Sequence, residues 1–313
     1  MLAIVAPGQG AQRPGFLQPW LSVPQFAERL AEFAEITGLD LPQLGSSADA
    51  NTIRDTAITQ PLLVAAGITS SELLLGQDAN WDSGVILAGH SVGEVTAAAL
   101  SGVLPASTAM AFVQARGAAM AVAAAAESTG MTAILGGDPD QVATAVTASG
   151  CTIANNNGRG QQVAAGTAEQ LAMLAACPPR RSRLVPLSVA GAFHTSHMVP
   201  AANQLNRFAA DISAARPQCL LLSNLDGALV EDGPDYLRRL IEQVAQPVRW
   251  DRCQDTLAEL GVTGLLELPP AGTLTGLAKR NLPGVDLFSL NTPDQLDEAR
   301  AFVTTHTHSL ERR

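Results

Sequence analysis

The sequence predicts an α/β fold in which a large parallel-sheet domain is interrupted by a smaller inserted domain. Short apolar segments alternate with longer segments of helical periodicity near both ends of the chain, which is typical of parallel strands covered by helices. Between about residues 130 and 189 the order changes to βαββαβ, the arrangement of a ferredoxin-like unit. The chain has 313 residues, of which 47% are hydrophobic, so it can bury a substantial core.

The first part of the large domain begins with a buried strand. Residues 2–6 are all apolar and run into the glycine-rich loop 7–12. Further along we expect helices at 24–37 and 60–75, a strand at 84–88, and helices at 92–100 and 107–126.

The inserted domain is expected over residues 129–189, between large-domain segments 1–128 and 190–313. Its expected elements are a strand at 131–135, a helix at 139–147, strands at 151–154 and 162–165, a helix at 168–176 and a strand at 184–189. The large domain then resumes with a strand at 218–223, helices at 234–244 and 251–260, a strand at 264–268 and a helix at 292–304.

Composition excludes several classes of function. The net charge of −10 at pH 7 repels nucleic acid and anionic membranes, so an anionic ligand has to be met by a local basic cluster. The segment nearest to a membrane span, residues 103–126, contains Arg116, and the N-terminus lacks a charged segment before an apolar one. We therefore expect a cytoplasmic protein without a membrane partner, and a monomer by default.

The cysteines indicate neither a disulfide framework nor a metal site. They lie singly along the chain, without a C-x-x-C pair, and reduced, buried thiols are the simplest interpretation. The four are Cys151, Cys177, Cys219 and Cys253. We therefore expect no metal and no cofactor.

One serine lies in a motif that imposes a specific backbone geometry. Gly89-His90-Ser91-Val92-Gly93 fits G-x-S-x-G, in which the glycines let a strand turn sharply into a helix and the serine oxygen projects from the carboxyl edge of the sheet. An apolar strand precedes the motif and a small-residue helix follows it, which makes the large domain hydrolase-like and Ser91 a candidate nucleophile. The alternative is an ordinary strand-to-helix turn in which Ser91 caps the helix.

A nucleophilic serine needs a base, and the chain has five histidines. His306 and His308 lie in a polar C-terminal stretch that we interpret as a solvated tail, and the side chain of His90 should point away from its neighbour Ser91. His194 and His197 remain, where the chain re-enters the large domain. We expect His194 to be the base and His197 to be satisfied by backbone at a helix start.

Acyl transfer through a serine also needs two N–H groups that stabilise the oxyanion. The N–H of Val92, directly after the nucleophile, is the first candidate. The second is the N–H of Gln9 in the glycine-rich loop, where Gly8 and Gly10 allow close backbone approach. A nucleotide-binding loop is the weaker interpretation, because Arg13 stands where a third glycine belongs and no G-K-[ST] occurs.

Arg116 is the only charged residue in the apolar, alanine-rich segment 105–126. A guanidinium in such surroundings is costly unless a carboxylate or phosphate meets it. Glu94 or another internal acid could be its partner. In the other interpretation, the substrate brings its own carboxylate.

Taken together, these motifs resemble the malonyl-CoA:acyl carrier protein transacylases and the related acyltransferase domains of polyketide synthases. The resemblance covers essentially the whole chain. Its motifs here, in order, are Pro7-Gly8-Gln9-Gly10-Ala11-Gln12, Thr59-Gln60-Pro61, Gly89-His90-Ser91-Val92-Gly93-Glu94, Gln114-Ala115-Arg116-Gly117, Asn155-Asn156-Asn157-Gly158, Gly191-Ala192-Phe193-His194, Gln246-Pro247-Val248-Arg249-Trp250 and Leu274-Thr275-Gly276-Leu277.

The resemblance implies a ping-pong transfer from malonyl-CoA to the phosphopantetheine thiol of acyl carrier protein. It implies that Ser91 is the nucleophile and His194 the base, with the backbone carbonyl of Gln243 orienting the histidine. It further implies that Arg116 binds the malonyl carboxylate and that Gln60 lies near the pocket.

The resemblance also bears on substrate choice. In the polyketide synthase domains a bulky aromatic residue at the position of Phe193 accompanies malonyl selection, and Val92 stands where glutamine would occur in other members. Both residues favour malonyl over methylmalonyl. We expect His90 among the substrate-binding residues as well. Two segments depart from the family pattern: Gly191 stands where the polyketide motif usually has histidine, and the Pro269–Gly272 loop also differs from the family sequence. The geometry of these two loops is therefore left open.

Coenzyme A and acyl carrier protein are acidic, so an acidic protein must bind them through local basic groups. The candidates are Arg159, Lys279-Arg280 and the group Arg180, Arg181 and Arg183, and each could equally be a solvated surface charge. Two other functions share the serine turn: a serine hydrolase or thioesterase of α/β type, and a non-catalytic scaffold that binds carrier protein.

Overall fold

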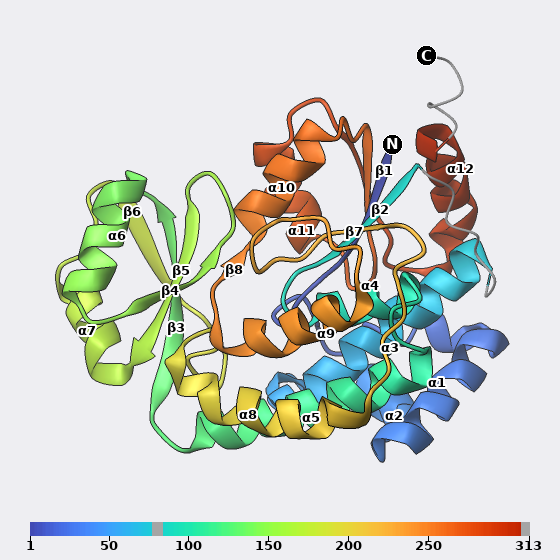
Figure 1. The fold of residues 1–313 in the computed structure, drawn as a ribbon, viewed down its shortest axis with the longest axis horizontal. Coiled ribbons are helices and arrows are strands. Elements are labelled where there is room, and N and C mark those ends of the chain that lie inside the picture. Colours follow the sequence, from blue (N-terminus) through green and yellow to red (C-terminus); the bar gives the residue numbers. More distant parts are fainter. Residues whose placement is uncertain (77–83, 308–313) are drawn as a thin grey trace.

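The computed structural model describes residues 1–76 and 84–307 and contains two sheets that lie side by side (Figure 1). Within these residues the larger sheet has the strand order β10-β9-β1-β2-β7, and all its pairs are parallel. Its strands are β1 (Leu2–Ala6), β2 (Val85–Gly89), β7 (Leu220–Leu221), β9 (Gly264–Glu267) and β10 (Asp286–Ser289). The predicted parallel α/β architecture is confirmed.

Strand β1 lies at the centre because all five of its residues are apolar and both faces are covered. It pairs with β2 in a register that places Ala6 opposite Gly89. Both strands therefore end at the same edge of the sheet, and the N–H of His90 donates to the carbonyl of Ala6 over 3.0 Å. This register brings the loop after β1 and the serine turn after β2 together.

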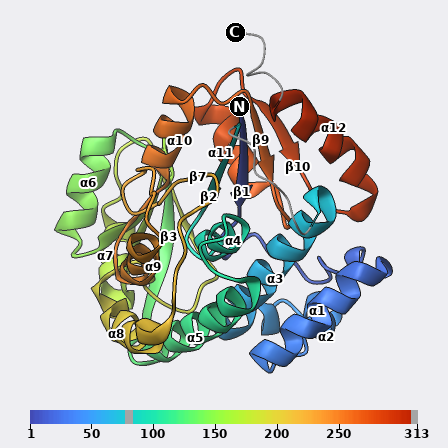
Figure 2. The same ribbon diagram turned by 45° about the vertical axis from the view of Figure 1, so that its right-hand side comes forward.

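Helices cover both faces of this sheet (Figure 2). Helix α4 (Gly93–Leu100) packs against β1 and β2, α11 (Thr273–Asn281) against β9 and β10, and α12 (Leu296–Thr307) against β1 and β9. The other helices outside the second sheet's βαββαβ unit are α1 (Pro24–Thr37), α2 (Leu41–Ser47), α3 (Thr56–Leu75), α5 (Ala106–Ala125), α8 (Val199–Phe208), α9 (Gly233–Glu242) and α10 (Trp250–Glu259).

Helices α3 and α5 are long and apolar enough to cross a membrane by length and composition alone. In this fold they pack against each other beside the large sheet. Most of the apolar window of α3 and half of that of α5 are buried inside the protein. The apolar side chains of α3 and α5 therefore belong to the core, and they surround Arg116, the one arginine of α5.

The second sheet has the order β6-β3-β5-β4-β8 and stands apart from the first (Figure 1). Its first four strands are antiparallel to their neighbours and, with two helices, follow the predicted βαββαβ order. The elements are β3 (Thr129–Gly136), α6 (Pro139–Ala148), β4 (Thr152–Asn156), β5 (Gln161–Thr167), α7 (Ala168–Ala176) and β6 (Ser182–Pro186). A fifth strand, β8 (Val248–Arg249), comes from beyond the predicted insert and pairs with β4 in parallel.

Most expected elements occur within a few residues of their predicted bounds, but helix α3 starts earlier than expected. The sequence pattern predicts a start at Gln60. In the structure Asp55 caps the helix, with its side chain accepting from the N–H of Ala57. Pro61 lies inside the helix.

Expectations about three single residues are wrong. His306 is not in a solvated tail: α12 extends to Thr307, and the imidazole is buried, with its Nδ1 3.0 Å from the hydroxyl of Thr263. His308 lies outside the described residues. The thiol of Cys177 is exposed because α7 ends there and the chain turns at the surface, and Cys219 is only partly buried.

Candidate active site

The serine turn has the geometry that G-x-S-x-G predicts. Strand β2 ends at Gly89, Ser91 has a φ of 53°, and α4 begins at Gly93. A Cβ at Gly89 would overlap the backbone of Gly93, and a Cβ at Gly93 would overlap the carbonyl oxygen of Ala6. Both glycines are therefore required by close backbone approach. Val92, not Ser91, occupies the N-cap position of α4, and no side chain caps the helix there.

The Oγ of Ser91 lies 2.7 Å from the Nε2 of His194, and the Nδ1 of His194 lies 2.7 Å from the carbonyl oxygen of Gln243. A carbonyl oxygen only accepts, so Nδ1 must hold the ring proton and Nε2 is left as an acceptor. The serine hydroxyl therefore donates to Nε2, which is the arrangement that a general base needs.

Burial and the positive charge of Arg116 lower the pKa of His194 to about 3. The imidazole is only 3% exposed, and its residue has a φ of 61°. A neutral imidazole at physiological pH is ready to accept a proton.

Arg116 lies fully buried on α5 and reaches the nucleophile. Its Nη2 donates to the Oγ of Ser91 over 3.3 Å and to the Oε1 of Gln243 over 3.0 Å, and its Nη1 donates to the Oε1 of Gln60 over 2.7 Å. Its Nε has no hydrogen-bond partner within the described part of the chain. Burial lowers the pKa of the guanidinium to about 10, so it stays charged at neutral pH.

The structure shows whether the guanidinium of Arg116 forms an ion pair with an acid of the chain. Among the described residues no carboxylate forms an ion pair with Arg116, although several surface arginines form such pairs. Glu94 lies one amide away: its Oε2 accepts from the Nε2 of Gln243, whose Oε1 faces Arg116. The direct internal ion pair is therefore absent here, and the guanidinium can receive a carboxylate from a ligand.

The two backbone groups expected to form an oxyanion hole lie on neighbouring loops. Val92 follows the nucleophile directly, and Gln9 follows β1 in the loop adjacent to the serine turn. A Cβ at Gly8 would lie 2.7 Å from the carbonyl oxygen of His90, so glycine is needed for the two loops to approach. The side-chain Nε2 of Gln9 donates to the hydroxyl of Thr56 over 3.3 Å, which holds this loop to α3.

Gln60 and Phe193 also lie beside the cluster. The Nε2 of Gln60 contacts the sulfur of Met120 at 3.4 Å, so the amide of Gln60 contacts both Arg116 and the side chain of Met120. Phe193 is 5% exposed and directly precedes His194 in the buried core.

His90 points away from the nucleophile. Its Nε2 lies 2.9 Å from the Oδ1 of Asn157, and its ring packs edge-on against Trp250. Burial lowers the pKa of His90. The imidazole thus joins the serine turn to the second sheet, and no hydrogen bond brings it to Ser91, His194 or Arg116 in the described residues. His197 contacts Glu127 at the surface, its Nδ1 lying 3.0 Å from the carboxylate.

Sequence reasoning missed one residue at the site. Asn224, which follows β7, accepts from the N–H of Ser91 through its Oδ1 over 3.0 Å. Its own N–H donates to the Oε1 of Glu94 over 2.6 Å. Asn224 belongs to no local motif, and 133 positions separate it from the serine. The order of elements along the chain does not indicate that Asn224 lies beside Ser91.

These groups can perform acyl transfer through a serine ester. A hydroxyl bonded to a neutral imidazole attacks a carbonyl carbon, and backbone N–H groups beside it can stabilise the oxyanion. A buried guanidinium at hydrogen-bond distance from that hydroxyl selects an acyl group with a carboxylate of its own.

Comparison with known proteins agrees with this chemistry. The acyl transferase domain family matches residues 4–285. The malonyl CoA-acyl carrier protein transacylase of Mycobacterium tuberculosis is 46% identical over 298 residues, which cover 95% of this chain and 99% of that protein. The protein of the same name from Escherichia coli is 32% identical, with 95% and 98% covered.

Solved structures give the same result. The crystal structure of MCAT from Mycobacterium tuberculosis superposes with a TM-score of 0.92 at 45% identity and covers 96% of this chain and 99% of its own. A type II PKS acyl-carrier protein in complex with its malonyl-transacylase matches with a TM-score of 0.89 at 29% identity, with 96% and 99% covered. The chain described here is an acyltransferase that belongs to the acyl transferase domain family.

Proposed function

We propose that this protein transfers a malonyl group from malonyl-CoA to the phosphopantetheine thiol of acyl carrier protein, for fatty acid or polyketide biosynthesis. The observation that supports this most directly is the buried guanidinium of Arg116 at 3.3 Å from the Oγ of Ser91. A carboxylate bound there brings the acyl carbon of a malonyl thioester close to the nucleophile. The names of the relatives described above agree with this substrate and this partner.

In the first half of the reaction, the Oγ of Ser91 attacks the thioester carbonyl carbon while the Nε2 of His194 takes the hydroxyl proton. The N–H groups of Gln9 and Val92 stabilise the oxyanion. The carbon–sulfur bond then breaks, and the protonated imidazole returns its proton to the leaving coenzyme A thiolate. The products are a malonyl-Ser91 ester and free coenzyme A.

The second half reverses these steps with a new thiol. His194 accepts the proton of the phosphopantetheine thiol, the sulfur attacks the ester carbonyl, and the ester carbon–oxygen bond breaks. The imidazole then returns the proton to the Oγ of Ser91. The carbonyl of Gln243 holds the ring in place through both halves, and as a neutral group it does not repel the malonyl carboxylate.

The electrostatics of the site favour an anionic acyl group. Arg116 helps to lower the pKa of His194, so the free site keeps its base neutral. A bound carboxylate offsets the charge of Arg116, which removes part of this effect and makes His194 a stronger base. Binding of the correct acyl group thus improves the base that activates Ser91.

We assign the choice of malonyl over methylmalonyl to Phe193. Phe193 is buried and directly precedes His194 in the sequence, and we propose that its ring takes the space that an added methyl on the acyl chain would need. One methyl in a pocket is worth only about 1–3 kcal/mol. Discrimination by this residue is therefore limited to roughly two orders of magnitude.

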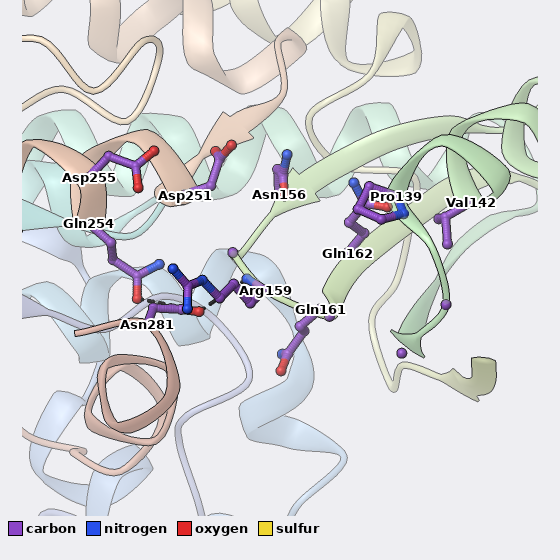
Figure 3. Close-up of a pocket in the computed structure, with 14 residues that line it drawn as sticks. Pro139, Val142, Asn156, Arg159, Gln161, Gln162, Asp251, Gln254, Asp255 and Asn281 are labelled. Carbon is purple, nitrogen blue, oxygen red and sulfur yellow. Dashed lines mark hydrogen bonds between the residues drawn. The ribbon is translucent and has the colours of Figure 1, made fainter. Parts of the chain in front are cut away.

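We place the approach of the pantetheine-bearing substrates at the seam between the second sheet and helices α10 and α11. A cavity of about 290 Å³ lies there, with Arg159, Gln254 and Asn281 on its walls (Figure 3). The amides of Gln254 and Asn281 both donate to the carbonyl of Asn157, whose side chain contacts His90 next to the nucleophile. The walls carry one basic side chain, Arg159, together with the carboxylates of Asp251 and Asp255, and we propose that Arg159 binds the phosphates.

A transfer assay tests the proposed function. With malonyl-CoA alone, the protein should release coenzyme A in an amount equal to the enzyme and then stop. Addition of carrier protein that bears phosphopantetheine should give malonyl-carrier protein, and carrier protein without the arm should not. Continuous release of free malonate would favour the hydrolase or thioesterase instead, and no release of coenzyme A at all would favour the scaffold.

A further inference from the structure

Glu94 is a buried acid that the reaction described above does not use. It lies in the first turn of α4 and is 0% exposed. Its Oε1 accepts from the N–H of Asn224 over 2.6 Å, and its Oε2 accepts from the Nε2 of Gln243 over 2.9 Å. Both partners are N–H donors, which favour the ionised carboxylate, whereas burial raises the pKa of Glu94 to about 7.

One of these bonds fixes the orientation of an amide. The Nε2 of Gln243 donates to Glu94 and to the carbonyl of Ser91, the latter over 2.9 Å, while its Oε1 accepts from Arg116. If this amide flipped, its NH2 group would face a guanidinium, which only donates, and its oxygen would face two acceptors. Glu94 therefore keeps the oxygen of Gln243 turned toward Arg116.

The other bond supports the nucleophile. Asn224 donates its N–H to Glu94 and accepts the N–H of Ser91 through its side chain. Ser91 has a positive φ, which is unfavourable for a residue with a side chain unless neighbours hold it. Glu94 thus reaches both sides of the serine turn through one intermediate residue on each side.

The spacing between Glu94 and Arg116 also has an electrostatic consequence. A carboxylate in direct contact would occupy the guanidinium N–H groups that a substrate needs. A carboxylate one amide away still lowers the cost of burying the positive charge and leaves Nε without a partner in the described residues.

We propose that Glu94 is a positioning residue that, through Gln243, keeps Arg116 oriented and open for the carboxylate of the acyl group. This inference rests on the proposed function, because it concerns the clamp for an anionic acyl group.

The first test is Glu94→Gln, which keeps the size of the side chain and removes its charge. The new amide has one oxygen for two donors, so Gln243 or Asn224 loses its acceptor. The rate of malonyl loading, as kcat/KM, should fall roughly tenfold to a hundredfold, which corresponds to a buried donor left unpaired. Acetyl loading, which does not use Arg116, should fall much less. Glu231→Gln removes the same charge from an exposed side chain and is the matched control.

A double-mutant cycle with Gln243→Met separates positioning from a general loss of structure. Methionine keeps the main-chain carbonyl that holds His194 and lacks the amide. If Glu94 acts through this amide, Gln243→Met alone lowers the ratio of malonyl to acetyl loading. Adding Glu94→Gln then changes that ratio little.

Three results would overturn the inference. Glu94→Gln could reduce malonyl and acetyl loading equally, the two substitutions could lower the ratio independently, or Gln243→Met alone could leave the ratio unchanged. The result for Gln243→Met decides the matter even if Glu94→Gln does not fold, because Glu94 is intact in the Gln243→Met variant. Failure of the proposed function would look different: the unmodified protein would take no malonyl group.

Discussion

The Nη2 atom of Arg116 donates to the Oγ of Ser91 over 3.3 Å inside a buried site. A guanidinium so close to a nucleophile restricts which acyl group can react there. In the proposed reaction it has no covalent role, and we propose that it binds one end of the substrate while the other end reacts with the serine.

Replacement of Arg116 by alanine should separate anionic from neutral acyl groups. We expect malonyl loading to fall by roughly a hundredfold, because a paired carboxylate loses hydrogen bonds that contribute about 1.5–3 kcal/mol each. Acetyl loading should be spared or even increase. Steady-state rates with both thioesters measure this, with Arg216→Ala at the surface as the control. Equal loss on both substrates would remove the carboxylate clamp from the account.

Replacement of His194 by alanine should lower malonyl loading by about 10²–10⁴-fold, the usual contribution of a general base. His197→Ala is the matched control, since its imidazole contacts Glu127 near the surface. That variant should load at the rate of the unmodified protein. The assignment of the base would be wrong if the two variants behaved alike.

The imidazole of His194 should remain neutral at about pH 5. Burial and Arg116 both disfavour the charged form and lower its pKa to about 3, far below the ordinary value near 6.5. NMR of labelled histidine can follow the titration, with the resonance assigned by its absence in His194→Ala. In Arg116→Met the pKa should rise, because a positive neighbour has been removed. A titration midpoint near 6.5 in the unmodified protein would refute this.

Simultaneous neutralisation of Arg180, Arg181 and Arg183 should weaken transfer to carrier protein. Arg183 belongs to strand β6 of the second sheet, and Arg180 and Arg181 lie in the loop before it. We expect a higher KM for carrier protein and a flatter dependence on salt, with malonyl loading unchanged. Arg207→Ala with Arg216→Ala is the control. If the triple variant kept its transfer rate and salt dependence, the docking surface would lie elsewhere.

The sequence could predict the residues that short motifs define. Ser91 is identified by its flanking glycines, and Arg116 by being a lone charge in an apolar helix, because each signal is local. The strand ends that bring Gln9 next to Val92 also follow from the parallel order. Contacts across the chain could not be predicted in this way: Asn224 and Glu94 lie 130 positions apart.

Helices α2 and α8 were also not predicted, although each has a proline in its first turn. Three further elements that were not predicted lack a clear local signal. Strand β8 has two residues, which is too short for any periodicity, and it exists only because β4 offers an edge for pairing. Strand β10 is half-buried at the edge of the large sheet and begins with Asp286. Helix α11 contains Gly276, and its first turn is held by the carboxylate of Glu267, a tertiary contact.

Intact-mass analysis after exposure to malonyl-, methylmalonyl- and acetyl-CoA tests the central claim most directly. The account predicts one malonyl group per chain, esterified to Ser91 and absent in Ser91→Ala, with far less methylmalonyl and acetyl adduct. No malonyl adduct, an adduct that persists in Ser91→Ala, or equal loading by acetyl-CoA would contradict it.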